Sequence, residues 1–145
     1  MTHDAALPDI SHNHFADLIG MQFARCERGH SRAYLEVEER LMNPNRVVHG
    51  GVIYTLADTS MGYALMSAIA ADELCATIEI KISYYTPATA GQLVCDTKIT
   101  HKTRRFAFLE SEVKQGHHVV AKATGTFVIS KARHEPPEAA APKGL

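Results

Sequence analysis

Hydrophobic and polar residues alternate along much of the chain, with the period of two that is typical of half-buried β-strands. Every second side chain is apolar in residues 31–38, and residues 76–85 repeat this pattern around three isoleucines. Further strands are expected from runs of similar length at residues 21–27, 92–100, 105–114 and 118–130. Residues 21–38 therefore predict a hairpin, and the chain after residue 76 predicts a meander of about four strands.

Helical segments lie on both sides of the predicted hairpin. Residues 11–19 predict a short amphipathic helix that is capped by Ser11 and stopped by Gly20. A longer helix is expected to begin at or just after His49-Gly50-Gly51 and to run to about Ala70.

The long helix is apolar on nearly its whole circumference. Such a helix must be buried nearly all round, so the sheet has to curl around it. Its main apolar face is expected to carry Ile53, Leu56, Ala57, Met61, Ala64 and Ala68, and the other side Val52, Tyr63 and Met66. We therefore predict an α+β architecture, in which a curved antiparallel sheet wraps around one long central helix.

The size and charge of the chain narrow the possible partners. The 145 residues predict a single domain at 1–130, followed by a Pro/Ala-rich tail at 131–145 that we expect to be disordered. The formal net charge is -1, and the chain has no Trp. This balance argues against a protein whose main task is to bind nucleic acid or an anionic membrane.

Targeting and membrane signals are weak in this sequence. The N-terminus has no apolar signal segment. Residues 52–70 are long enough to be checked as a membrane span, but they contain Asp58 and several hydroxyl groups and have no basic flanks. We therefore expect a cytoplasmic protein that does not enter a membrane.

The cysteines and histidines do not form metal-binding or disulfide motifs. Cys26, Cys75 and Cys95 are widely spaced, without a CxxC pair, so we expect buried thiols in a reducing compartment. The pairs His12/His14 and His117/His118 have no accompanying Cys or carboxylate pattern, so no metal site is expected.

Asp58 is the only charged residue between Val52 and Ala70. An ionised carboxylate in apolar surroundings is costly unless it is paired or hydrogen-bonded. Asp58 is therefore either a structural residue, facing a solvent gap or capping a neighbouring loop, or a nucleophile or general base in a largely dry cleft.

The sequence His49-Gly50-Gly51 opens the same helix. Its two glycines leave backbone N–H groups uncovered at the positive end of the helix dipole, which suits the oxyanion of acyl transfer, although a flexible start to the helix is the simpler interpretation. His49 and Asp58 are nine positions apart, which corresponds to roughly 13 Å of rise and about 180° of rotation. Either the two residues are unrelated, or the site is composite and a second subunit supplies one half.

The spacing of Asn43, His49-Gly50-Gly51 and Asp58 resembles that of the hot-dog acyl-CoA thioesterases of the phenylacetic-acid-degradation type. The stretches VVHGGVIYTLADTSMGYAL and ATIEIKISYYTPATAGQLV are also similar to this family, so the likeness extends from Asn43 to the last strand. It implies a hot-dog fold and hydrolysis of an acyl-CoA to the free acid and CoA. It also implies a dimer or a dimer of dimers, and no cofactor apart from the CoA of the substrate.

The resemblance implies a role for each matching residue. Asp58 acts as the nucleophile or as the base that activates water, and the Gly50 amide donates to the thioester oxygen. His49 orients the start of the helix, and Asn43 positions the attacking water or the partner subunit's Asp58. Thr77 stands where many members have Ser, and keeps the hydroxyl.

Lys102, Arg104 and Arg105 form the densest basic cluster, at a predicted turn. The family's substrate carries phosphates, so we expect this cluster to contact CoA, although an ordinary solvated turn has the same composition.

Other functions and the acyl group stay open at this level. A non-catalytic acyl-CoA or acyl-carrier binder could use the same cleft, and a hot-dog hydratase is a further alternative. No Ser–His–Asp triad or GxSxG motif is visible. Aryl-acetyl, benzoyl and medium-chain acyl groups are all possible, because Tyr54, Met61, Tyr63, Met66 and Tyr84 either line an aromatic pocket or fill the core.

Overall fold

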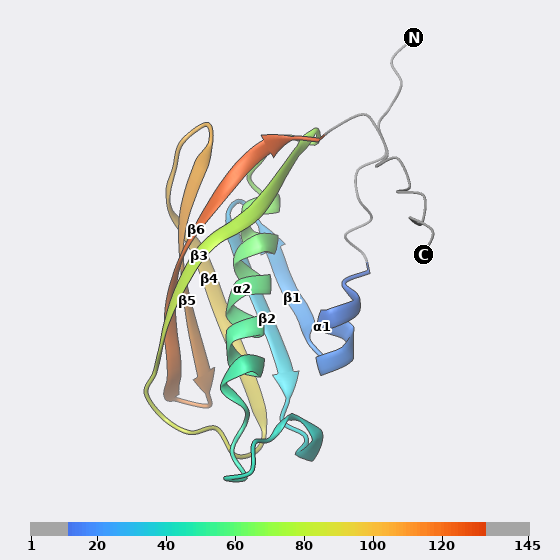
Figure 1. The fold of residues 1–145 in the computed structure, drawn as a ribbon, viewed down its shortest axis with the longest axis vertical. Helices are drawn as coiled ribbons and strands as arrows, with labels where there is room; N and C mark the ends of the chain where they lie inside the picture. The colour runs from blue at the N-terminus through green and yellow to red at the C-terminus, as the bar shows by residue number, and fades with distance from the viewer. Residues whose placement is uncertain (1–11, 133–145) are drawn as a thin grey trace, which may run out of the picture.

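The computed structural model describes residues 12–132, in which six strands and two α-helices follow one another along the chain (Figure 1). The N-terminal part contains α1 (His14–Ile19), β1 (Gln22–Glu27), β2 (His30–Glu36) and a short 3-10 turn at Glu39–Leu41. The rest contains α2 (Gly50–Met66), β3 (Glu73–Tyr84), β4 (Gln92–Lys102), β5 (Phe106–Gln115) and β6 (His118–Lys131).

The strands form one antiparallel sheet in the order β1-β2-β4-β5-β6-β3. The sheet is strongly curved, and α2 lies against its inner face (Figure 1). Along β5, Ala107, Leu109 and Val113 are buried and point towards α2, and Glu110 lies on the outer face. The predicted α+β hot-dog architecture is confirmed, and the strand period of two sets which side chains reach the core.

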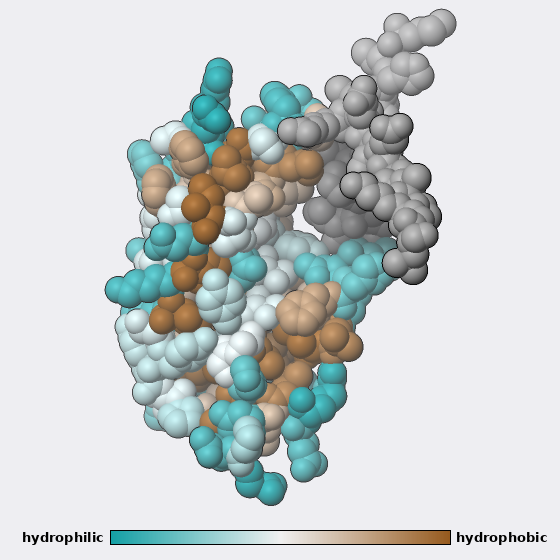
Figure 2. Space-filling model, in the orientation of Figure 1, coloured by the Kyte–Doolittle hydropathy of each residue, from teal (hydrophilic) through white to brown (hydrophobic). Residues whose placement is uncertain are grey.

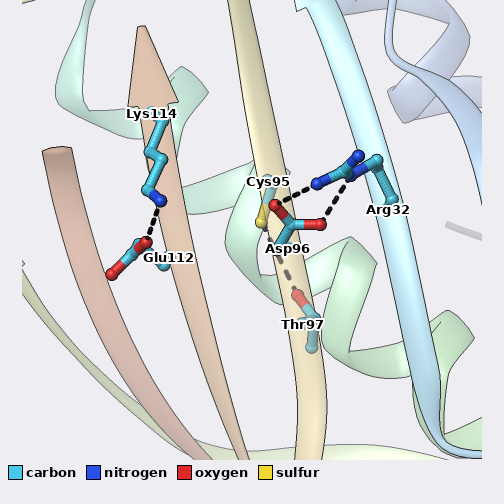
Figure 3. A network of polar contacts seen from close by, with 6 residues as sticks. All are labelled: Arg32, Cys95, Asp96, Thr97, Glu112 and Lys114. Atoms are coloured by element: carbon cyan, nitrogen blue, oxygen red, sulfur yellow. Dashed lines mark hydrogen bonds and ion pairs between the residues drawn. The ribbon is translucent and has the colours of Figure 1, made fainter. Parts of the chain in front are cut away.

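Figure 3 shows this alternation at close range on β4. Asp96 points to the outer face and accepts two hydrogen bonds from Arg32 on β2, at 2.7 and 2.9 Å. Its neighbours Cys95 and Thr97 point into the core. A second exposed ion pair joins Glu112 to Lys114 at 2.8 Å. Exposed pairs of this kind contribute little stability, so the core carries most of the fold's free energy.

The burial of α2 differs from the prediction. The face against the sheet is buried and carries Ile53, Leu56, Ala57, Ser60, Met61, Ala64 and Leu65. The opposite face, with Tyr54, Asp58 and Gly62, is half-buried within one chain. The expectation of a helix buried nearly all round is therefore wrong for a single chain, because the sheet covers only one side of it.

Hydroxyl groups of the sheet fix α2 in place. Ser31 on β2 donates to the backbone carbonyl of Ser60 at 2.7 Å. Thr97 and Ser111 share a hydrogen bond of 2.6 Å in the same buried layer. The Ser60 hydroxyl is buried and has no partner among residues 12–132. Polar contacts of this kind specify the position of α2 against the sheet more sharply than apolar packing alone.

The ends of both helices differ from the prediction. Asn13, and not Ser11, caps α1, because its side-chain oxygen accepts from the Ala16 amide at 3.0 Å; Ser11 lies outside the described residues. Gly20 stops α1 as predicted, with a φ of 78°. The long helix ends at Met66 rather than near Ala70, because the Ser67 hydroxyl donates to the Ala64 carbonyl and accepts from the Gly29 amide.

The sequence also leads to predictions for the C-terminal tail, the cysteines and a possible membrane span. Lys131, which we assigned to the tail, ends β6, and the rest of the predicted tail lies outside the described residues. Cys95 is buried and Cys75 half-buried, but Cys26 is exposed, so the prediction of buried thiols is wrong for Cys26. Within residues 12–132, no helix is long and apolar enough to cross a membrane.

Candidate active site

Asp58 and Thr77 come together between α2 and β3. The Thr77 hydroxyl donates to Asp58 Oδ1 at 2.7 Å. Asp58 lies on the half-buried face of α2, and Oδ2 has no partner within the described part of the chain. Asp58 therefore does not cap a neighbouring loop. One carboxylate oxygen is held in place and the other is available, which is the arrangement that a general base or a nucleophile requires.

A β-bulge brings Thr77 to Asp58. The pairing of β3 with β6 shifts between Thr77 and Glu79, so Ile78 is an extra residue in β3. In a regular strand Thr77 and Ile80 would face opposite sides of the sheet, but here both face α2. The alternating pattern predicts that Ile78 and Ile80 share a face, and this prediction is wrong, since Ile78 is 54% exposed and Ile80 packs against the core.

The start of α2 is fixed by its own residues. His49 is the N-cap, and its Nδ1 accepts from the Gly51 amide at 2.8 Å, which assigns the ring proton to Nε2. A Cβ added at Gly51 would lie only 2.9 Å from His49 Nδ1, so a side chain there would displace the His49 ring. His49-Gly50-Gly51 therefore forms a capped start to the helix.

Gly50 combines a free donor with a fixed carbonyl. Its amide has no hydrogen-bond partner among residues 12–132, and its carbonyl accepts from the Tyr84 hydroxyl at 2.9 Å. A Cβ added at Gly50 would lie 3.3 Å from the Tyr84 ring. An unpaired amide at the start of a helix is suited to bind a developing oxyanion.

Asn43 shapes the loop before α2. Its side-chain oxygen accepts from the Asn45 amide at 2.9 Å, and its backbone amide donates to the Val47 carbonyl at 2.8 Å. The loop also contains Arg46 with a φ of 61°. These contacts leave the side-chain NH2 of Asn43 without a partner in the described structure. Within one chain, no hydrogen bond joins Asn43 to Asp58.

Four of the five predicted catalytic residues therefore form two groups within one chain, and Asn43 lies apart in the loop before α2. Asp58 and Thr77 make the first group, and His49 and Gly50 make the second, about 12–13 Å away along α2. The basic cluster joins neither group. Lys102, Arg104 and Arg105 are exposed at the turn between β4 and β5, which lies at the opposite end of the sheet from the start of α2 (Figure 1).

Cys75 lies close to the carboxylate but is not suited to act as a nucleophile. Its thiol contacts the Gly62 carbonyl at 3.8 Å. Burial, and secondarily the negative charge of Asp58, raises the pKa of the Cys75 thiol above its ordinary value. The reactive thiolate is therefore disfavoured at neutral pH.

One hollow of the described structure adjoins the site. A pocket of about 390 Å³ lies beside Gly50, between the start of α2 and the segment that follows β3. Tyr84, for which the sequence allows either a pocket or a core position, lines this pocket. A larger groove of about 820 Å³ crosses the outer face of the sheet and is lined by charges of both signs, among them Lys98 and Glu110.

Among the residues that the structure describes, no group of three or more His, Cys, Asp or Glu side chains is arranged to hold a metal ion.

Known proteins resemble this chain in sequence. The model of the thioesterase superfamily matches residues 45–122. The protein SSO1253 of Saccharolobus solfataricus is 26% identical over 114 residues, which cover 78% of this chain and 75% of that protein. The 1,4-dihydroxy-2-naphthoyl-CoA hydrolase of Listeria monocytogenes is 27% identical over 85 residues, which cover 59% of this chain and 69% of the hydrolase.

Solved structures share the fold. The conserved protein PA5202 from Pseudomonas aeruginosa has a TM-score of 0.80 at 32% identity, covering 82% of this chain and 95% of that protein. The E. coli PaaI protein from the phenylacetic acid degradation operon has a TM-score of 0.79 at 21% identity, covering 84% and 88%. The predicted hot-dog architecture of the phenylacetic-acid-degradation type is confirmed.

Proposed function

Because the chain belongs to the thioesterase superfamily and is a thioester hydrolase, we propose that its substrate is an acyl-CoA with a small aromatic or medium-chain acyl group. The products are the free acid and CoA. Asp58 is the proposed nucleophile or general base, and the Gly50 amide is the proposed oxyanion donor. The observation that carries the proposal is the Asp58 carboxylate, held by Thr77 on a helix that has no other charged residue.

The simplest chemistry uses Asp58 as a base. The carboxylate takes a proton from water, and the hydroxide attacks the thioester carbon. The carbonyl oxygen gains negative charge and is stabilised by the Gly50 amide, and the C–S bond then breaks so that CoA leaves as a thiolate and takes up a proton. In the alternative, the carboxylate attacks the thioester carbon directly, the C–S bond breaks and CoA leaves as a thiolate that takes up a proton. Water then hydrolyses the resulting anhydride of Asp58, which releases the free acid and restores the carboxylate.

Each chain holds only half of this machinery in one place, so we propose that the site is completed by a second copy. The free edge of the sheet at β3 favours this arrangement. It is twelve residues long, and Figure 2 shows apolar surface along its course. An exposed apolar edge strand readily pairs with another chain. A two-fold axis through this edge would bring the partner subunit's Asp58 towards Gly50 and create two equal sites in a dimer, or four in a dimer of dimers.

The remaining predicted residues take supporting roles in this proposal. His49 holds the helix start so that the Gly50 amide points to the substrate. The free NH2 of Asn43 positions the attacking water or the partner subunit's Asp58. Lys102, Arg104 and Arg105 are proposed to contact the CoA phosphates, because guanidinium and ammonium groups bind phosphate by charge-assisted hydrogen bonds.

The test is to measure CoA release with a thiol reagent for Asp58→Asn, which keeps the size of the side chain. Phenylacetyl-CoA, benzoyl-CoA and octanoyl-CoA are the substrates. We expect kcat to fall by about 100-fold or more, since a general base contributes typically ~10²–10⁴-fold. Asp96→Asn on the outer face is the matched control and should retain activity. Near-wild-type hydrolysis by Asp58→Asn would overturn the assignment.

A further inference from the structure

The pocket beside Gly50 has no role in the chemistry described so far. It lies between the loop before α2, the first turn of α2 and the segment after β3. The Val48 amide donates to the Ala88 carbonyl at 2.8 Å, so the two flanking segments are tied together. Val48 is 4% exposed and Ala88 1% exposed, which gives the pocket a rigid base.

The walls of this pocket are uncharged. Its lining is mainly apolar, from Val47, Val48, Ile53, Pro87, Ala88 and the ring of Tyr84. Among residues 12–132, no Asp, Glu, Lys, Arg or His lines it. A charged group that entered it would lose water without gaining an ionic partner, and this is costly. An apolar group would gain free energy from the area that it buries. The volume of about 390 Å³ exceeds the ~150 Å³ of a cavity that holds benzene.

Tyr84 connects the pocket to the start of α2. Its ring forms a wall of the pocket, and its hydroxyl donates to the Gly50 carbonyl at 2.9 Å. Burial raises the pKa of the Tyr84 phenol, so it remains a protonated donor at neutral pH. Gly50 has no side chain to restrict its backbone, so this hydrogen bond and the contact with the ring hold its peptide groups in place.

We propose that the pocket beside Gly50 receives the acyl group of the substrate and selects uncharged apolar acyl groups. Tyr84 is the positioning residue. Its ring contacts the bound acyl group, and its hydroxyl holds Gly50 so that the Gly50 amide is correctly oriented. This rests on the proposed function. The hydroxyl of Tyr84 controls the oxyanion donor and therefore kcat, whereas the ring of Tyr84 controls the fit of the acyl group and therefore selectivity.

The first test separates the hydroxyl from the ring. Tyr84→Phe keeps the wall and removes the hydrogen bond, so kcat for octanoyl-CoA should fall about fivefold, with KM changed less than twofold. Tyr34→Phe is the matched control, because the Tyr34 hydroxyl bonds Gln22 on the sheet and lies away from Gly50. If kcat for Tyr84→Phe equals that of Tyr34→Phe, the positioning role is wrong.

The second test concerns selectivity. Wild-type kcat/KM should be at least about 100-fold lower for succinyl-CoA than for octanoyl-CoA, because succinyl would place a carboxylate in the uncharged pocket. Tyr84→Ala should narrow the preference for octanoyl-CoA over acetyl-CoA by about tenfold. If Tyr84→Ala lowers kcat/KM equally for both acyl groups, or if succinyl-CoA is hydrolysed as fast as octanoyl-CoA, the pocket does not hold the acyl group.

A binding measurement keeps this inference separate from the proposed function. S-Octyl-CoA, a thioether that cannot be hydrolysed, should bind the wild type about tenfold more tightly than CoA by calorimetry, and Tyr84→Ala should abolish the difference. This result would support the pocket even if Asp58→Asn left hydrolysis unchanged and the catalytic assignment failed. Equal affinities of the wild type for S-octyl-CoA and CoA would overturn the pocket even if Asp58→Asn abolished activity.

Discussion

The two parts of α2 that carry the proposed chemistry are held in different ways. The start of the helix is fixed mainly by its own residues, through the His49 cap and the close packing of Gly51 on the His49 ring. Tyr84 at the end of β3 adds one hydrogen bond to the Gly50 carbonyl. The middle of the helix depends on another element, because Thr77 on β3 holds the Asp58 carboxylate through a β-bulge. Each part is structurally complete within one chain, yet they lie too far apart to act on one bond. The difference indicates that each part has its own structural support, and in the proposed function a second copy of the chain brings the two parts together.

The largest effect is expected when the two parts of α2 are inactivated in different subunits of one oligomer. Asp58→Asn removes the carboxylate, and Gly50→Pro removes the backbone N–H at the first position of α2, where proline fits a helix. Each variant should lower kcat by about 100-fold or more in the homo-oligomer. After the two variants are mixed and reassembled, half of the dimers should be hybrids with one intact site of two, so about a quarter of wild-type activity should return. The measurement is CoA release, with hybrid formation followed by native mass spectrometry. Confirmed hybrids without activity would contradict a shared site.

A smaller effect is expected at the bulge. Thr77→Val removes the hydroxyl that orients Asp58, and kcat should fall about tenfold, because one charge-assisted hydrogen bond contributes ~1.5–3 kcal/mol. Thr77→Ser keeps the hydroxyl and should stay within about threefold of the wild type. Thr100→Val is the control, since its hydroxyl bonds the Phe108 carbonyl and lies away from α2. An equal loss in Thr77→Val and Thr100→Val would show that the hydroxyl has no special role.

The start of the helix can be tested through stability. Gly51→Ala would place its Cβ 2.9 Å from His49 Nδ1 and displace the cap, so we expect the free energy of unfolding to fall by about 1 kcal/mol. Gly62→Ala is the matched change in the same helix, and a Cβ there would meet nothing within 4 Å. Its higher helix propensity should raise the stability by up to about 1 kcal/mol. Urea denaturation measures both, and equal effects would mean that the cap is not rigid.

The smallest effect is expected outside both parts. Asp96→Asn removes the exposed ion pair with Arg32, so the free energy of unfolding should change by less than about 1 kcal/mol. Denaturation at low and high salt should give nearly the same result for this variant. A loss above 2 kcal/mol would show that the outer face contributes more to the fold than its exposure suggests.

The sequence predicts the strands well because each is short, alternating and bounded by turn residues. The residues that interrupt a regular pattern are harder to predict. The bulge at Ile78 reverses the phase of β3, and nothing local distinguishes Ile78 from Ile80. The bulge could have been inferred in one way. Thr77 and Ile80 cannot share a face in a regular strand, so assigning Thr77 to the site and Ile80 to the core requires an extra residue between them.

Contacts between distant segments explain the other differences. The long helix ends at Met66 because the Ser67 hydroxyl accepts a hydrogen bond from the Gly29 amide, which lies 38 positions earlier in the chain. Tyr84 was left undecided because its partner, the Gly50 carbonyl, lies 34 positions away. Asp58 and Gly50 were predicted from the sequence because a lone charge and paired glycines are unusual in an apolar helix. Their surroundings could not be predicted, because distant parts of the chain supply them.

The bulge in β3 determines whether Thr77 faces Asp58, and the rest of the fold does not depend on this contact. Deleting Ile78 would restore a regular strand, in which the residues before it turn over while Ile80 and Ile82 keep their places in the core. Thr77 would then face away from Asp58, although the sheet would still close over α2. We expect this one-residue deletion to lower kcat about tenfold, as for Thr77→Val, so the loss of a single codon would weaken the proposed activity while the fold persists.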